Sequence, residues 1–253
     1  MFFPIGDDDS EVSRVSYVTH TLLIANIVVF ALQWIYPEIT YGWSVIPREL
    51  VTGVDLIEPA AVAVDGGYVN VPQAQGPRII WFTLISSMFM HGGLGHIGGN
   101  MLYLWIFGNN VEQRFGHLRF LLFYLISGLI GSVAQIIVSP GSVIPMLGAS
   151  GAISGVMGAY LVLFPHNRIN AIFFFQVVTV PAVIVLGMWV VTQFLGGWGS
   201  LGATGGGVAY LAHIGGFISG AIAGLIARAQ LKREPDSLLY RQYQRDPDSR
   251  LWW

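Results

Sequence analysis

Long apolar stretches alternate with short polar segments along most of the chain. Runs of about 17 to 25 apolar residues are typical of transmembrane helices. The pattern predicts six such spans, at 16–36, 92–111, 118–139, 150–165, 171–195 and 206–228. The segment 37–91 carries too many charged residues to cross a membrane. We therefore expect an all-α, polytopic membrane protein with six transmembrane helices and a long first extracytoplasmic loop.

Composition supports a membrane protein. Hydrophobic residues make up 54% of the chain and charged residues 10%, whereas soluble domains contain about 25% charged residues. The net charge of −2 gives no electrostatic reason to expect nucleic acid as a partner. The absence of cysteine excludes disulfides, thiolate metal ligands and cysteine nucleophiles. The expected environment is the lipid bilayer.

Basic residues are unequally divided between the two sides of the predicted bundle. An even number of spans places both termini on one side, and of the twelve Lys and Arg residues only Arg48 and Arg78 fall on the other. By the positive-inside rule, both termini are cytoplasmic. The predicted organisation is a cytoplasmic segment at 1–15, a six-span domain at 16–229 and a cytoplasmic tail at 230–253. The compact core is typical of a prokaryotic plasma-membrane protein.

A few polar side chains fall within the predicted spans, where burial in lipid is costly and usually functional. The second span opens with HGGLGHIGGN, which contains His91, His96 and Asn100. The fourth span opens with Ser150, and the sixth contains His213. Because these three spans all begin on the non-cytoplasmic side, we expect their polar residues to meet in the outer half of the membrane.

Glycines follow both the serine and the histidine at helical spacing. They are Gly151, Gly155 and Gly158 after Ser150, and Gly216, Gly220 and Gly224 after His213. Faces of small residues allow two helix axes to approach closely. This spacing predicts that the fourth and sixth spans pack tightly enough for a hydrogen bond between Ser150 and His213.

The distribution of acidic residues excludes several catalytic mechanisms. No Asp or Glu lies between Glu112 and Glu234, so the last four spans cannot supply a pair of catalytic aspartates. No HExxH motif occurs, and no cysteine or carboxylate joins the histidines, so no metal or other cofactor is expected. Serine becomes a nucleophile when a base removes its proton, and histidine suits that task near neutral pH. The sequence therefore favours a dyad of Ser150 and His213.

Other groups near the start of the fourth span are candidates for stabilising an oxyanion. The first backbone N–H groups of a helix lack partners within that helix. Asn100 and His96 share one helix face at spacing i and i+4 and either supply side-chain donors or form a buried polar pair that fixes the second span. His91 lies away from that face and is expected to make a structural hydrogen bond.

The motifs around these residues resemble those of the rhomboid intramembrane serine proteases. GASG at 148–151 is similar to the family's GxSG, which implies Ser150 as nucleophile, and AHIGG at 212–216 is similar to its AHxGG, which implies His213 as base. HGGLGHIGGN resembles HxxxxHxxxN and implies His96 and Asn100 as oxyanion donors. The remaining motif positions are expected to be structural: His91, Gly148, Gly151 and Gly216.

The resemblance covers about residues 16–229. It implies a six-helix bundle without cofactor that cleaves transmembrane or membrane-proximal segments of other membrane proteins. The alternative is a non-catalytic relative that binds and sorts membrane clients, although such proteins usually lack the serine or the histidine. The chain departs from many members at Ser154, where an aromatic residue would pack on the histidine, and it has no Trp-Arg pair in the first loop.

Two further features lie between Ser150 and His213 in the sequence. Pro181 is expected to kink the fifth span, and the glycine-rich segment 195–207 is expected to form a mobile lid.

Overall fold

The structure is a computed structural model of the full chain. It describes residues 3–8, 12, 14–64, 67–200 and 208–231. Most of the predicted tail at 230–253, and 201–207 of the predicted lid, lie outside the described residues.

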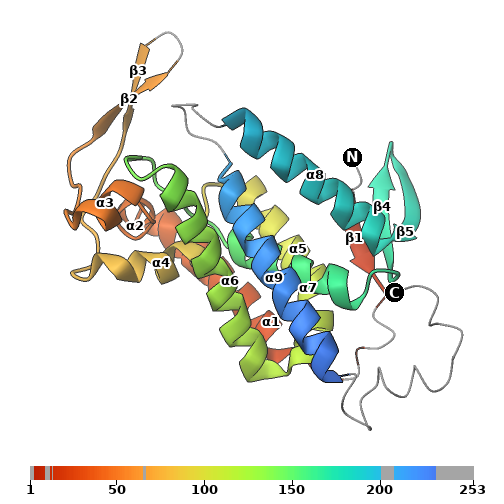
Figure 1. Ribbon diagram of the computed structural model, residues 1–253. Helices are drawn as coiled ribbons and strands as arrows, with labels where there is room; N and C mark the ends of the chain where they lie inside the picture. The colour runs from red at the N-terminus through yellow and green to blue at the C-terminus, as the bar shows by residue number, and fades with distance from the viewer. Residues whose placement is uncertain (1–2, 9–11, 13, 65–66, 201–207, 232–253) are drawn as a thin grey trace, which may run out of the picture.

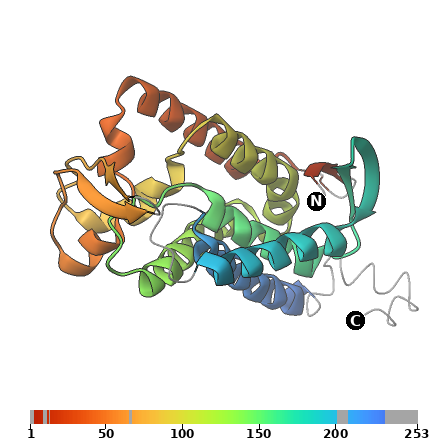
Figure 2. The same cartoon turned by 90° about the horizontal axis from the view of Figure 1, so that it is seen from above.

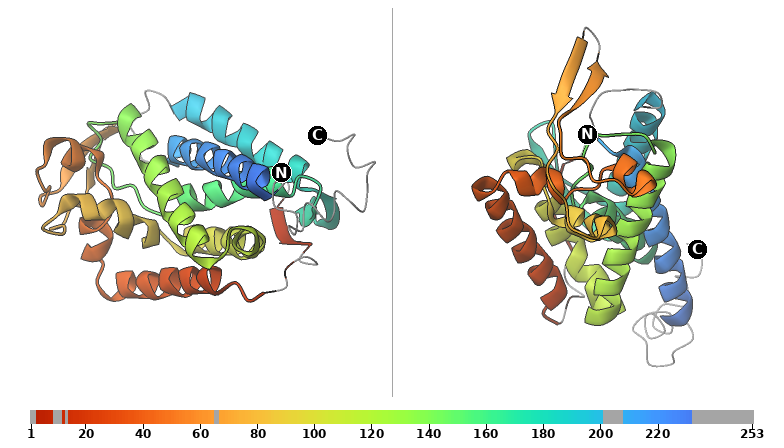
Figure 3. Two further views of the ribbon diagram at one scale, coloured as in Figure 1. Left: turned by 60° about the horizontal axis from the view of Figure 1, so that its bottom comes forward. Right: turned by 90° about the vertical axis from the view of Figure 1, so that its left-hand side faces the viewer.

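Six helices of the described residues form a bundle (Figure 1). They are α1 (Tyr17–Ile35), α5 (Leu94–Phe115), α6 (His117–Val138), α7 (Ser150–Leu163), α8 (Ala182–Ser200) and α9 (Tyr210–Leu231). Among the described residues, α1, α6 and α9 are long and apolar enough to cross a membrane. The short α7 is central, because all ten of its residues from Gly151 to Tyr160 are buried. Figures 2 and 3 show α1 on the side of the bundle opposite α8 and α9.

Five of the six predicted segments coincide with a helix to within a few residues, but the fifth does not. Residues 168–181 form a hairpin of β4 (Arg168–Phe173) and β5 (Gln176–Pro181), and α8 begins only at Ala182. The hairpin is rich in β-branched and aromatic residues, which favour strands, and its hydropathy resembles that of a buried helix. Pro181 therefore ends β5 instead of kinking a helix, and residues 195–200 of the predicted lid belong to α8.

The prediction of an all-α fold is wrong in detail, because two small sheets accompany the bundle. One is a three-stranded antiparallel sheet in which β1 (Phe3–Asp7) pairs with β4, and β4 with β5. The other is the hairpin of β2 (Ala60–Val64) and β3 (Gly67–Val71) in the first loop. The N-terminal segment is thus paired with the connection between α7 and α8.

The first loop supports the segment that leads into α7. It contains α2 (Glu38–Gly42), α3 (Pro47–Thr52), α4 (Thr83–Ser86) and the flanking 3-10 turns η1 (Ile80–Phe82) and η2 (Ser87–Phe89). Val45 and Met146 exchange backbone hydrogen bonds of 3.0 and 2.7 Å. The Gly148 N–H donates to the carbonyl of Ser87 at 2.9 Å. These bonds hold the backbone just before Ser150.

The carboxylates of Glu112 and Asp7 join several elements at the end of the bundle away from Ser150. Glu112, 1% exposed, accepts hydrogen bonds from the backbone N–H groups of Val18 and Thr19 at 2.9 and 2.7 Å. It thereby caps the first turn of α1, because the first N–H groups of a helix have no acceptor within that helix. Asp7 accepts from the Asn110 amide at 2.7 Å and from the Tyr160 hydroxyl at 2.6 Å. The N-terminal strand is thus tied to α5 and α7.

Glycines allow α7 and α9 to touch backbone to backbone. A Cβ atom at Gly216 would overlap the carbonyl oxygen of Gly151, and one at Gly220 would overlap that of Gly155. A Cβ at Gly158 would in turn overlap the carbonyl oxygen of Phe217. Since each of these neighbours is main chain, no side-chain movement can make room.

We predict that Gly220→Ala destabilises the bundle. Overpacking of a tight interior costs about 1 to 3 kcal/mol, and here the obstructing atom is a backbone carbonyl. The thermal midpoint of the purified protein in detergent should fall by several degrees. Gly98→Ala in α5 is the matched control, because open space surrounds a Cβ at that position. Equal midpoints for the two variants would contradict the packing described above.

We also predict that the stability of the protein depends on pH through Glu49 in the first loop. This side chain is 2% exposed and accepts a hydrogen bond from the Leu56 N–H at 2.8 Å. Burial raises the pKa of Glu49 to about 7, the Leu56 N–H opposes this shift, and the negative charge of Asp55 adds to it. Because the folded pKa lies above the ordinary value of 4.5, the folded state binds the extra proton between these two values.

The stability of the wild type should therefore decrease as the pH rises through that window, and the thermal midpoint in detergent should record the decrease. Glu49→Gln removes the titrating group and keeps a carbonyl oxygen to accept from Leu56, so its midpoint should vary less over the same range. Identical pH profiles for the two proteins would show that Glu49 does not titrate in this window.

Candidate active site

Ser150 is the first residue of α7. Its own N–H is therefore one of the helix-terminal donors without an intrahelical partner. Gly148, two residues earlier, has a φ of 124°, a conformation that side chains of L-residues rarely adopt. The backbone thus turns sharply at Gly148 and enters α7 with the serine at its start.

His213 of α9 lies next to Ser150. The Nε2 atom of His213 and the Oγ atom of Ser150 are 2.7 Å apart, a normal distance for a hydrogen bond to a hydroxyl. On the far side of the ring, Nδ1 lies 2.7 Å from Oε1 of Gln193 in α8. Since Oε1 can only accept, Nδ1 carries the hydrogen, and Nε2 is free to accept from the serine hydroxyl.

His96 and Asn100 converge on Gly148. A Cβ atom at Gly148 would lie 2.7 Å from Nε2 of His96 and 3.6 Å from Nδ2 of Asn100. The Gly92 N–H donates to Nδ1 of His96 at 3.3 Å, which leaves Nε2 of that ring as its donor. Nδ2 of Asn100 is buried and has no hydrogen-bond partner among the described residues. Two side-chain donors thus point to the backbone two residues before Ser150.

His91 is held through its backbone. Its N–H donates to Oε1 of Gln33 at 2.9 Å, and its carbonyl accepts from Nε2 of Gln33 at 3.1 Å. The buried ring packs edge-on against His96, with ring centroids 5.1 Å apart. His91 therefore links α1 to the start of α5 and contacts the site indirectly.

Ser154 is turned away from the histidine. Its hydroxyl donates to the carbonyl oxygen of Ser150 at 2.6 Å, and the side chain is 1% exposed. This hydroxyl is therefore satisfied within α7. The aromatic neighbour of His213 is instead Trp189 of α8, at a centroid distance of 5.9 Å and an interplanar angle of 35°.

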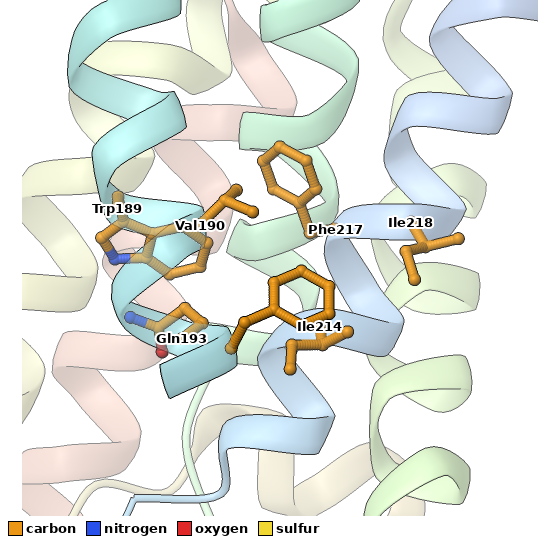
Figure 4. A pocket seen from close by; sticks show the side chains of 7 residues that line it. Trp189, Val190, Gln193, Ile214, Phe217 and Ile218 are labelled. Carbon is orange, nitrogen blue, oxygen red and sulfur yellow. The ribbon is translucent and has the colours of Figure 1, made fainter. Parts of the chain in front are cut away.

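Gln193 and Trp189 are not among the residues that the sequence pattern singled out. Gln193 carries the same signal as His213, a polar side chain within an apolar helix. It is 8% exposed, and its neighbours in α8 are largely apolar. Figure 4 shows Trp189 and Gln193 on α8, facing α9 across a crevice. The other residues that line this crevice are apolar: Val190, Phe194, Ile214, Phe217 and Ile218.

This arrangement is suited to acyl transfer. A serine hydroxyl donates to an imidazole whose other nitrogen is already paired, and the unpaired Nδ2 of Asn100 lies beside Gly148, two residues before the serine. Such groups can activate a nucleophile and stabilise the negative charge that develops on the attacked carbonyl oxygen.

Known proteins of one family resemble this chain. The sequence model of the Rhomboid domain matches residues 79–230, which include every residue of the candidate site. The chain is 42% identical over 103 residues to Rhomboid protease GluP of Bacillus subtilis, covering 41% of this chain and 19% of the relative. It is 35% identical over 148 residues to the mitochondrial Rhomboid protein 1 of Saccharomyces cerevisiae, covering 56% and 40%.

A third relative, the putative rhomboid protease YdcA of Bacillus subtilis, is 30% identical over 158 residues, covering 62% of this chain and 70% of the relative. The chain thus spans less than half the length of the first two relatives. The domain match includes more than half of the chain and confirms the resemblance drawn from the motifs. The chain belongs to the rhomboid family.

Proposed function

We propose that the protein is an intramembrane serine endopeptidase that cleaves transmembrane or membrane-proximal segments of other membrane proteins. The observation that carries this proposal is the 2.7 Å contact between Oγ of Ser150 and Nε2 of His213. Membership of a family whose relatives include named rhomboid proteases supports it.

In the first half of the reaction, Oγ of Ser150 attacks the carbonyl carbon of the peptide bond, and Nε2 of His213 takes the hydroxyl proton. The tetrahedral intermediate collapses when the C–N bond breaks, and His213 returns the proton to the leaving amine. In the second half, water attacks the acyl-enzyme with His213 again as base. This releases the new carboxyl terminus and restores Ser150.

Three donors are available for the oxyanion of the tetrahedral intermediate. They are the backbone N–H of Ser150, Nδ2 of Asn100 and Nε2 of His96. The lack of a partner for Nδ2 of Asn100 supports this role, because a buried donor without a hydrogen bond is costly in the resting state. Each such donor contributes about 3 kcal/mol to transition-state stabilisation.

The proposed topology has six membrane-crossing helices with both termini in the cytoplasm. Ten of the twelve basic residues then lie on the cytoplasmic side, as the positive-inside rule requires. With 14 residues, α7 is about 21 Å long, against a hydrocarbon thickness of about 30 Å. With the inner end of α7 at the cytoplasmic surface, Ser150 lies below the outer surface, and the proposed hydrolysis requires water to reach it from the non-cytoplasmic side.

We predict that a fluorophosphonate probe labels the wild type in detergent and leaves Ser150→Ala unlabelled. The probe phosphorus reacts with an activated serine hydroxyl, and only a serine paired with a base has that reactivity. In-gel fluorescence measures the result. Ser219→Ala in α9 is the matched control, because the Ser219 hydroxyl donates to the carbonyl of Gly216 and not to a histidine. A folded wild type that takes no label would contradict the protease proposal and favour a client-binding role.

We further predict that Asn100→Ala lowers kcat by about 100-fold while KM changes little, because the lost donor acts only on the transition state. Cleavage of a reconstituted transmembrane substrate in liposomes measures both constants. Asn109→Ala, near the opposite end of α5, should leave kcat unchanged. A raised KM with normal kcat would assign Asn100 to substrate binding instead.

A further inference from the structure

We propose that Gln193 is the positioning residue for the base, and that α8 thereby completes the dyad of α7 and α9. In this assignment Gln193 holds the His213 imidazole in the tautomer and orientation that activate Ser150, while Trp189 supports the face of the ring. This inference rests on the proposed protease function and adds a third residue to its site.

The hydrogen bonds of His213 fix the tautomer of its ring. His213 can accept the Ser150 proton at Nε2 only if Nδ1 holds the ring hydrogen. Oε1 of Gln193 lies 2.7 Å from Nδ1 and accepts that hydrogen. The amide nitrogen of Gln193 donates to Oγ1 of Thr192 at 3.2 Å, so both ends of the amide are satisfied with the oxygen directed at the histidine.

Burial of Gln193 favours one orientation of the His213 imidazole. The Gln193 side chain is 8% exposed, and a buried polar group that loses its partner costs about 1 to 3 kcal/mol. Rotation of the imidazole by 180° would remove Nδ1–H from Oε1 and would remove Nε2 from Ser150 at the same step. The two hydrogen bonds of the ring, each 2.7 Å long, therefore favour the same orientation.

An amide suits this position better than a carboxylate. In the Ser-His-Asp triad an aspartate orients the histidine through the same ring nitrogen. The chain has no acidic residue between Glu112 and Glu234, and an ionised carboxylate is expensive inside a membrane. Gln193 supplies the same carbonyl-type acceptor without a charge.

Trp189 supplies the second contact from the same helix. It precedes Gln193 by four residues, so both side chains lie on one face of α8, and both line the crevice between α8 and α9 (Figure 4). Its ring lies 5.9 Å from that of His213 and 6.1 Å from that of Phe217. Ser154 of α7 gives the ring no such cover, because its hydroxyl is bonded to the Ser150 carbonyl.

The test is the rate of fluorophosphonate labelling for Gln193→Leu, which keeps the approximate volume and removes the acceptor. We expect labelling and kcat to fall by about 10- to 100-fold, as for the loss of about 1.4 to 2.7 kcal/mol of transition-state stabilisation, with KM unchanged. Gln193→Glu in its neutral form keeps an uncharged carbonyl oxygen at the same place and should retain more of the labelling rate than Gln193→Leu. A merely structural role for Gln193 would not separate these two variants.

Gln135→Leu is the matched control. Gln135 of α6 also accepts a hydrogen bond from α9, through the Leu211 N–H at 3.2 Å, but it is bonded to the backbone and not to the imidazole. This variant should keep the wild-type labelling rate. Thermal midpoints of all three variants in detergent show whether the bundle is intact.

The outcomes separate the two proposals. A labelled wild type together with a Gln193→Leu variant of equal rate would overturn the role of Gln193 and leave the protease proposal standing. Equal losses of rate and of thermal midpoint in Gln193→Leu and Gln135→Leu would also overturn it, since helix packing would then explain both. An unlabelled, folded wild type would overturn the protease proposal, and the role of Gln193 would fall with it.

Discussion

The direct contact between the backbones of α7 and α9 is the constraint on which the site depends. Gly216 lies against the carbonyl of Gly151, so no side chain separates the two helices. Ser150 directly precedes Gly151, and His213 lies three residues before Gly216. The contact between the two glycines therefore sets the distance between the Ser150 hydroxyl and the His213 imidazole. Each glycine costs a helix about 1 kcal/mol of propensity relative to alanine. That cost is offset by the packing that glycine permits.

The two ends of the bundle use polar groups in different ways. At the end away from Ser150, the carboxylates of Glu112 and Asp7 are fully engaged by donors from other elements and join α1, α5, α7 and the N-terminal strand. At the other end, Nδ2 of Asn100 remains unpaired among the described residues. The carboxylates thus join elements at one end, and at the other end an unpaired donor lies beside the backbone that leads to Ser150.

Residue spacing predicts the proximity of Ser150 and His213 in the candidate site but not the contact from α8. Ser150 and His213 could be paired because each opens a glycine-lined face, and that pattern is local to each helix. The contact between Gln193 and His213 depends on how α8 is rotated about its own axis, which no spacing within α8 specifies. The predicted span 171–195 includes most of the hairpin, because hydropathy does not distinguish an apolar hairpin from the start of an apolar helix.

Because α8 supports the His213 ring, the orientation of the ring depends on the position of this helix. The proposed nucleophile and base belong to helices that glycines hold in direct backbone contact. Both supports of the imidazole instead come from α8, which is separated from α9 by a crevice of mainly apolar side chains. If α8 withdraws by little more than the length of a hydrogen bond, the ring loses its orienting acceptor and its aromatic cover together, while Ser150 and its backbone stay in place. Under the proposed assignment, His213 is therefore oriented as a base only when α8 is packed against α9.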